Sequence, residues 1–437
     1  MNTRELGLTM CTALVIGNTI GMGIFILPAA LAPFGLNALT GWAVVIVGCA
    51  CIAIVYAALA RRLPQADGPF GYIRATLGEP VAFPALWCYW ISVWVTNAAL
   101  AVAIVGYFLT VFPAAKVIPS AALTVGFMWL FVGVNLLGVK SGGRVQVVTS
   151  LLKLVPLVLV MVLGGAAILA EPSAYTPILP TTPIELRPSM AAATIALFAM
   201  LGFESAAVAA GRVKDPERTI PRATLIGTLI VAIVYVAIVV IGMLLVPQAT
   251  LAASDAPFVT ILDSLLGAGS GRWLAVFVVI SGLGALNGWT LLGSELTRTL
   301  AMHRLLPEIF GRSNRYGAPW AALLLVGALA TFVGLMNYSE SLVAGFTFLS
   351  VLVTAANLPL YLCSALAILY LLRREPRALP SSISLAGLGG IAFTVFAFFG
   401  VGREPFLWAM ALALAGVPVY FWMRWRHPAP TVAAQSS

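Results

Sequence analysis

The first long apolar run of the chain, residues 8–31, carries at its middle the stretch Gly17-Asn18-Thr19-Ile20-Gly21-Met22-Gly23. The run is long enough to cross the roughly 30 Å hydrocarbon core of a bilayer as a helix. Its clustered glycines weaken that helix, because glycine loses the most backbone entropy on folding. A helix that unwinds inside a membrane frees backbone N–H and C=O groups, which lipid cannot satisfy. The stretch therefore predicts a broken transmembrane helix whose break faces a cavity or a ligand.

Around this stretch the composition is that of a membrane protein. Of the 437 residues, 61% are hydrophobic and 9% are charged, whereas a soluble domain has about 25% charged residues. The apolar runs are helix-length and lack the alternation of a membrane β-barrel. We expect an all-α membrane protein with twelve transmembrane helices, at about 8–31, 38–60, 82–112, 120–138, 146–170, 189–211, 223–246, 273–301, 319–336, 342–372, 381–400 and 405–424.

The basic residues predict the orientation of the chain. Its net charge of +9 is carried by short loops between apolar runs, which favours a role in membrane topology over nucleic-acid binding. With the N-terminus inside, 19 Lys and Arg lie on the cytoplasmic side and 4 (Lys116, Arg187, Arg272 and Arg403) lie outside. We therefore expect an inner-membrane protein with both termini in the cytoplasm. The segment 249–272 is amphipathic at best and is expected on the outer face.

A second glycine break is predicted in the sixth span, where Met200-Leu201-Gly202-Phe203-Glu204-Ser205 contains Gly202. An offset of five spans gives the second unit inverted topology, and paired broken helices are a sequence sign of a transporter's binding site. Freed N–H groups attract a carboxylate and freed carbonyls attract an ammonium, so an α-amino acid suits both. The alternative is that these glycines only let helices pack closely.

These residues resemble a known family. The stretch from Gly17 to Phe25 is similar to the Gly-Ser-Gly signature that opens amino acid–polyamine–organocation transporters. The segment from Gly202 to Ser205 and the later Lys214-Asp215-Pro216-Glu217-Arg218-Thr219-Ile220-Pro221 resemble the sixth span and following loop of that superfamily. Asn287-Gly288-Trp289-Thr290 resembles the eighth span of the arginine/agmatine-type antiporters.

The resemblance implies a fold and an activity. We expect one transporter domain over residues 1–437, with helices 1–5 at 8–170 and helices 6–10 at 189–372 as inverted repeats. Helices 11 and 12, at 381–424, lie outside the five-plus-five repeat. The implied activity is exchange or proton-coupled uptake of amino acids.

The resemblance also implies site residues. Backbone groups from Thr19 to Gly23 would bind the substrate carboxylate, and carbonyls near Leu201 and the first break would bind the ammonium. Met22 stands where the family has serine, so recognition there rests on the backbone. The implied substrate-binding set is Asn18, Thr19, Met22, Gly23, Tyr89, Ser92, Val93, Asn97, Leu100, Phe198, Leu201 and Trp289. Asn97 and Trp289 match contacts to a cationic side chain, Phe198 replaces a tryptophan gate, and Tyr89 matches a vestibule aromatic.

Three charged residues inside predicted spans need an explanation, because a charge at mid-bilayer costs about 2.5–3.5 kcal/mol. Lys153 resembles the fifth-span lysine of proton-coupled and neutral amino acid members, whose ammonium replaces a sodium ion and binds first-span carbonyls; the alternative is snorkelling to the interface. Glu204 matches a proton-sensitive glutamate, or else only stabilises the second break. Glu295 is expected to pair with Arg298 at i,i+3 spacing.

Taken together, the expected function is alternating-access transport of an amino acid, with a cationic amino acid or its amine favoured. A neutral amino acid, a polyamine or another organocation remains open, since no acidic residue is clearly placed to pair a substrate guanidinium. A channel would need a continuous polar lining, and a membrane enzyme would need clustered His, Asp or Cys. No cofactor, no metal and no nucleic acid is expected as a partner. The expected partners are the amino acid or amine substrate and the lipid bilayer. Assembly into a homodimer is left open.

Overall fold

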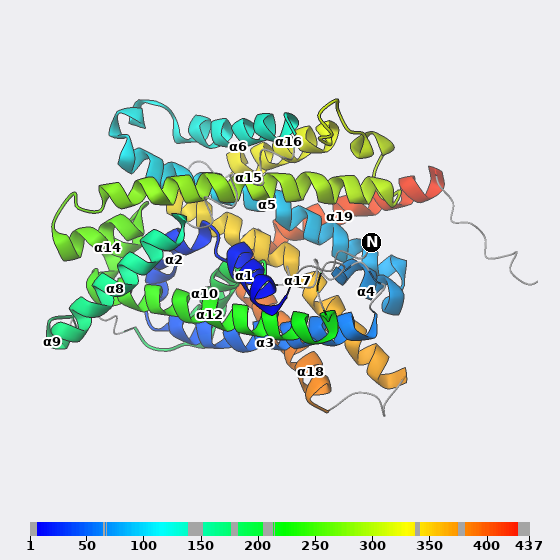
Figure 1. Ribbon diagram of the computed structural model, residues 1–437, viewed down its shortest axis with the longest axis horizontal. Coiled ribbons are helices and arrows are strands. Elements are labelled where there is room, and N and C mark those ends of the chain that lie inside the picture. The colour runs from blue at the N-terminus through cyan, green and yellow to red at the C-terminus, as the bar shows by residue number, and fades with distance from the viewer. Residues whose placement is uncertain are drawn as a thin grey trace, which may run out of the picture.

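A computed structural model describes residues 7–63, 66, 68–138, 152–175, 182–203, 213, 215–336, 341–374 and 381–426. The described secondary structure is helical (Figure 1). In chain order the first half contains α1 (Leu8–Thr19), α2 (Gly23–Leu31), η1 (Ala32–Phe34), α3 (Asn37–Arg62), α4 (Gly68–Leu77), α5 (Glu79–Val111), η2 (Pro113–Val117), α6 (Ser120–Leu136), α8 (Leu154–Ala170), α9 (Pro172–Tyr175) and α10 (Leu186–Met200). The second half contains α12 (Pro216–Leu245), α13 (Gln248–Ala252), α14 (Pro257–Leu266), α15 (Arg272–Met302), η5 (Glu308–Gly311), α16 (Trp320–Met336), α17 (Leu342–Arg374), α18 (Ser381–Gly400) and α19 (Arg403–Arg426).

Each expected apolar run contains a described helix. Among the described residues, 7 helices are long and apolar enough to cross a membrane, and shorter apolar helices such as α6, α8, α10 and α16 accompany them. The segment 249–272 forms only the short helices α13 and α14, as expected for a segment that does not span. The loop after α3 contains the additional helix α4, which the turn-rich sequence there did not predict.

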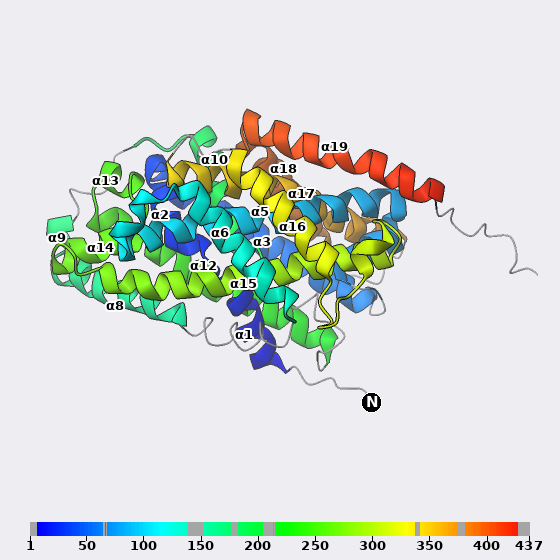
Figure 2. The same cartoon turned by 90° about the horizontal axis from the view of Figure 1, so that it is seen from above.

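The long helix α5 forms the centre of the bundle and is buried along most of its length. It packs against α17 and α15, while α6, α16 and α19 contact it elsewhere. Figure 1 places α6 with α16 along one edge of the molecule and α3 with α12 along the opposite edge, and in the view from above α6 and α16 lie in front of the other two (Figure 2). The broken elements α1, α2 and α10 lie between these two sides, in contact with α3 and α12.

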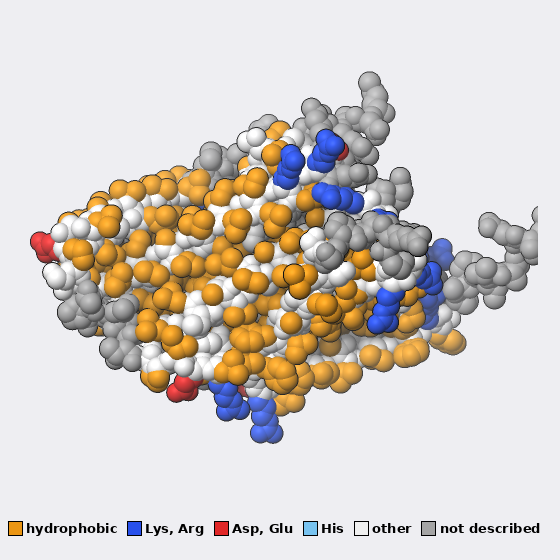
Figure 3. Space-filling view, turned by 90° about the horizontal axis from the view of Figure 1, so that it is seen from below, with side chains coloured by type: hydrophobic (Ala, Val, Ile, Leu, Met, Phe, Trp, Pro, Cys, Tyr) orange, Lys and Arg blue, Asp and Glu red, His pale blue; other side chains and the backbone are white. Residues whose placement is uncertain are grey.

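The molecular surface fits a bilayer. Hydrophobic side chains cover its flank, and most of the visible Lys and Arg side chains gather towards one end of the long axis (Figure 3). The outward face of α19 alone exposes Leu407, Leu414, Phe421 and Trp425. Lipid tails can cover such a face, whereas water would penalise it.

The first predicted break lies within the described residues, and of the second only the end of the helix before it and the residues up to Phe203 are described, because residues 204–211 of the sixth predicted span lie outside the described part of the chain. Helix α1 ends at Thr19 and α2 begins at Gly23, with Ile20 in an extended conformation between them. Helix α10 ends at Met200, and Gly202 follows with φ of 107°. That φ lies in the left-handed region, which glycine adopts without a steric penalty. Glycine thus permits the chain to leave the helix at the second break.

Candidate functional site

The two breaks meet in space. A Cβ built on Gly23 would lie 3.0 Å from the Phe198 ring and 3.8 Å from the Ala199 Cα. The start of α2 therefore packs directly on the end of α10, and a larger residue at position 23 would push against the aromatic ring. The sequence predicted that these two segments face one another only because they hold matching positions in the two expected repeats. In the structure the start of α2 contacts the end of α10.

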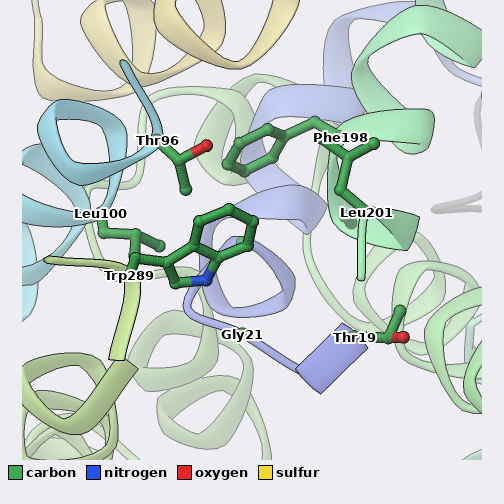
Figure 4. Close-up of a pocket in the computed structure, with 9 residues that line it drawn as sticks. Thr19, Gly21, Thr96, Leu100, Phe198, Leu201 and Trp289 are labelled. Atoms are coloured by element: carbon green, nitrogen blue, oxygen red, sulfur yellow. The ribbon is translucent and has the colours of Figure 1, made fainter. Parts of the chain in front are cut away.

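A small cavity lies at this junction. Its volume is about 20 Å³, which is room for roughly one water molecule. The lining includes Thr19, Gly21, Thr96, Leu100 and Trp289, together with Gly23, Phe198, Ala199 and Leu201. In the close-up the Phe198 ring and the Trp289 indole lie on one side of the Gly21 backbone, with Thr96 and Leu100 beside them (Figure 4). Any amino acid would need the surrounding helices to separate before it could enter.

The first-span glycines do not all serve close helix packing. Among the described residues, a Cβ on Gly17 or Gly21 would meet no atom within 4 Å, whereas a Cβ on Gly23 would meet Phe198. Glycines kept only for close packing would show tight contacts at each position. Gly21 lines the cavity instead, so its missing side chain leaves the backbone of the break accessible.

The ammonium of Lys153 binds the C-terminal end of α1. Its Nζ donates to the carbonyl oxygen of Gly17 and, at 2.6 Å, to that of Ile20. The side chain is 7% exposed, so it points into the bundle and does not extend to the interface. Lys153 immediately precedes α8, and this contact therefore joins the fifth predicted span to the break in the first.

A third carbonyl at the break, that of Thr19, also accepts a hydrogen bond from within the protein. Tyr235 of α12 donates its hydroxyl to the carbonyl oxygen of Thr19 at 3.0 Å, and the Thr19 hydroxyl donates back to Val15 at 2.8 Å. The carbonyls of Gly17, Thr19 and Ile20 thus have partners within the protein. The start of α2 packs on the end of α10 at Phe198, and a helix N-terminus favours an anion.

The expected site residues fall into two groups. Thr19, Gly23, Leu100, Phe198, Leu201 and Trp289 line the cavity. Ser92, Val93 and Asn97 are buried in α5, and Tyr89 is partly buried in a cluster with α4 and α17. Met22 is fully buried, and its sulfur lies 2.9 Å from the position of a Cβ on Gly282 of α15. Glu204 and the side chain of Asn18 lie outside the described residues.

The cavity also includes Gly21, which lies within the expected backbone stretch from Thr19 to Gly23, and two residues that were not expected, namely Thr96 and Ala199. Thr96 and Leu100 are four residues apart and therefore share one face of α5. That helical spacing is a signal in the sequence that could have placed Thr96 beside Leu100. Among the described residues, the lining contains no carboxylate.

Hydrogen bonds between polar side chains join α5, α6 and α15 next to the cavity. Thr290 of α15 donates to the Asn97 side-chain oxygen at 2.9 Å, and Asn97 donates to the Val93 carbonyl at 3.1 Å. Further along α15, Asn135 of α6 donates to the Asn287 side-chain oxygen at 2.9 Å. Interhelical amide bonds of this kind hold membrane helices together. Asn97 thus supports the wall of the cavity in this conformation.

The ionisable residues at the end of α15 form the expected pair, with Arg298 3.7 Å from Glu295. Both side chains are partly exposed, so the pair contributes little stability. No group of three His, Cys, Asp or Glu side chains suited to a metal occurs in the part of the chain that the structure describes.

Comparison with known proteins decides the family. The family model for amino acid permeases matches residues 6–421. The chain belongs to the amino acid permease family. This permease is 32% identical to the cadaverine/lysine antiporter of Escherichia coli over 342 residues, which cover 77% of the chain and 76% of that antiporter. It is 27% identical to the putrescine transporter PotE of Haemophilus influenzae, with 96% of the chain and 97% of the relative covered. It is 29% identical to a putative arginine/ornithine antiporter of Bacillus subtilis, with 83% and 84% covered.

Membership of this family makes the chain a multi-pass membrane transport protein and not an enzyme. It also confirms the resemblance that was drawn from the motifs in the first, sixth and eighth predicted spans.

Proposed function

We propose that this permease exchanges a cationic amino acid for an amine across the inner membrane by alternating access. By their names, one relative exchanges cadaverine and lysine, a second transports putrescine, and a third is a putative antiporter of arginine and ornithine. The proposal includes twelve spans, a five-plus-five inverted repeat and cytoplasmic termini. The observation that carries it is the cavity between the two helix breaks, which is lined by Phe198 and Trp289.

The chemistry of this cavity suits an amino acid head group next to an aliphatic amine. The N-terminal end of α2 would bind the carboxylate through its backbone N–H groups. The faces of Trp289 and Phe198 would attract an ammonium by a cation–π interaction, with tryptophan the stronger of the two. Leu100 and Leu201 would contact the methylene chain.

Lys153 and Glu204 complete the proposal. The Lys153 ammonium would stabilise the broken end of α1 in place of a bound cation, a role supported by its bonds to Gly17 and Ile20. Glu204 would take up a proton during the cycle. Replacement of Glu204 by Gln should then flatten the pH dependence of exchange, whereas an unchanged pH profile in an active variant would remove that role.

A neutral amino acid is the second candidate, because the polar side-chain groups of the described lining are two threonine hydroxyls and the Trp289 indole N–H, and it contains no carboxylate. The deciding experiment is uptake into proteoliposomes preloaded with unlabelled substrate or left empty. Labelled lysine, arginine, ornithine, cadaverine, putrescine and leucine would be compared. We expect uptake of a cationic substrate that is stimulated by internal substrate. Uptake of leucine alone would favour the second candidate, and transport of none of these compounds would refute both.

A further inference from the structure

A second cavity lies at the C-terminal end of α5. Its volume is about 590 Å³, within the usual range for small-molecule sites. It lies between the end of α5, η2, the start of α6, the connector before α14 and the start of α17, and Leu109, Lys116, Ser120, Asp255 and Ser341 line it. Leu109 is nine residues beyond Leu100 on α5, so these two lining residues are separated by about 13 Å along the helix axis.

Two opposite charges face this cavity. Lys116 is exposed on η2, and Asp255 projects from the connector between α13 and α14. Partial desolvation raises the pKa of Asp255, while the backbone N–H of Val343 and the charge of Lys116 lower it. Among the described residues Lys116 has no partner in an ion pair. The cavity therefore offers one cation and one anion that do not neutralise each other through a direct contact.

The connector that carries Asp255 is held in place. A Cβ on Gly106 of α5 would lie 2.4 Å from the Asp255 carbonyl oxygen, so only glycine allows the connector to lie this close. Tyr107 donates to the Phe25 carbonyl at 2.6 Å and accepts from the Phe258 N–H at 3.2 Å, which joins α5, α2 and α14. The Ser341 hydroxyl accepts from the Ala344 N–H at 3.2 Å at the start of α17. Asp255 thus has a defined position, while Lys116 is a long side chain that can move towards a ligand.

We propose that this cavity is an outer recruiting site for the α-amino and α-carboxylate groups of the incoming amino acid. Lys116 binds the carboxylate and Asp255 binds the α-ammonium, with the Ser120 and Ser341 hydroxyls nearby. A diamine has no carboxylate and meets Lys116 as a like charge. The site therefore selects the amino acid over the amine on this face. The inference rests on the proposed exchange function and on the orientation that places η2 outside.

The test uses the full chain in proteoliposomes and measures the KM for external lysine and for external cadaverine separately. Lys116→Gln should raise the KM for lysine by roughly two- to fivefold, the effect of an exposed charge pair, and should weaken its dependence on salt. The KM for cadaverine should stay constant or fall. Asp255→Asn should also raise the KM for lysine, and kcat should be unchanged in both variants. Arg187→Gln is the matched control, because it removes an exposed charge from the same face at the start of α10.

Two results would overturn the proposal. One is an equal change in KM for lysine in Lys116→Gln and Arg187→Gln, which would indicate only a general surface potential. The other is an equal change for lysine and cadaverine in Lys116→Gln, which would remove the selectivity. Equilibrium dialysis of labelled lysine against the detergent-solubilised protein is independent of orientation. It should find two sites per chain in the wild type, and in Lys116→Gln one of the two should bind lysine roughly two- to fivefold more weakly. Wild-type protein without exchange would refute the proposed function instead, and a KM effect seen only from the other face would refute the orientation.

Discussion

Replacement of Lys153 by Met removes the ammonium and keeps a side chain of similar length. In the structure this ammonium donates to the carbonyls of Gly17 and Ile20 at the first helix break. With Met at this position both carbonyls lose a charged donor in a buried environment. We expect a weaker α1 end, a slower exchange rate and a lower melting temperature, without loss of insertion into the membrane.

The size of the effect follows from two opposing contributions. Each hydrogen bond from a charged group contributes about 1.5–3 kcal/mol, so the loss of two costs roughly 3–6 kcal/mol. Removal of the buried charge returns about 2.5–3.5 kcal/mol. The net destabilisation of the bonded conformation then lies between roughly −0.5 and 3.5 kcal/mol, with a midpoint of about 1.5 kcal/mol. Since 1.4 kcal/mol is a factor of ten, the population of that conformation should fall about twelvefold at the midpoint.

The assay is counterflow of labelled lysine into proteoliposomes, with the reconstituted amount measured and the melting temperature recorded in detergent. Lys153→Arg is the control, because it retains the charge and the donors with an altered geometry. It should exchange faster than Lys153→Met. Wild-type rates and an unchanged melting temperature in Lys153→Met would refute the reasoning and favour an interfacial lysine.

Three further substitutions test the central site. Gly23→Ala would place a methyl group 3.0 Å from the Phe198 ring, so the ring must shift and the maximal exchange rate should fall, with expression level as the check on folding. Tyr235→Phe removes the hydroxyl that bonds the Thr19 carbonyl, and it should lower stability by about 0.5–1.5 kcal/mol, measured as a lower melting temperature; an unchanged value would show that another group replaces the hydroxyl. Trp289→Leu keeps an apolar lining but removes the aromatic face, and the KM for a cationic substrate should rise several-fold while that for leucine, if transported, should not; equal changes would exclude a cation–π contribution.

Much of this architecture can be predicted from the sequence, because a bilayer imposes simple rules. Helix-length apolar runs follow from the thickness of the hydrocarbon core, and each run contains a described helix. The glycines at 21 and 202 follow shortly after the ends of α1 and α10. Backbone that leaves a helix inside a membrane must face a cavity or the protein, which is why these glycines pointed to the site. The intramembrane position of Lys153 already required a buried partner, and the carbonyls of α1 supply it.

The composition of the site is harder to predict, because it depends on helix rotation. Thr96 and Asn97 are neighbours on α5, yet Thr96 lines the cavity and Asn97 bonds to Thr290 on a different face. Adjacent helical positions differ by about 100° in direction, and the hydropathy of a helix that is buried on all sides carries no record of which face meets the substrate. The direction of Met22 towards Gly282 is likewise a consequence of packing between distant helices.

The Lys153 contact also bears on the energetics of transport. Its positive charge is covalently part of the chain, so it crosses no membrane and dissipates no ion gradient during a cycle. If Lys153 acts in place of a bound cation, as proposed, the carrier draws its driving force from the gradients of its substrates and of any proton that accompanies them. The direction of net flux would then reverse whenever those gradients reverse, with no change in the protein.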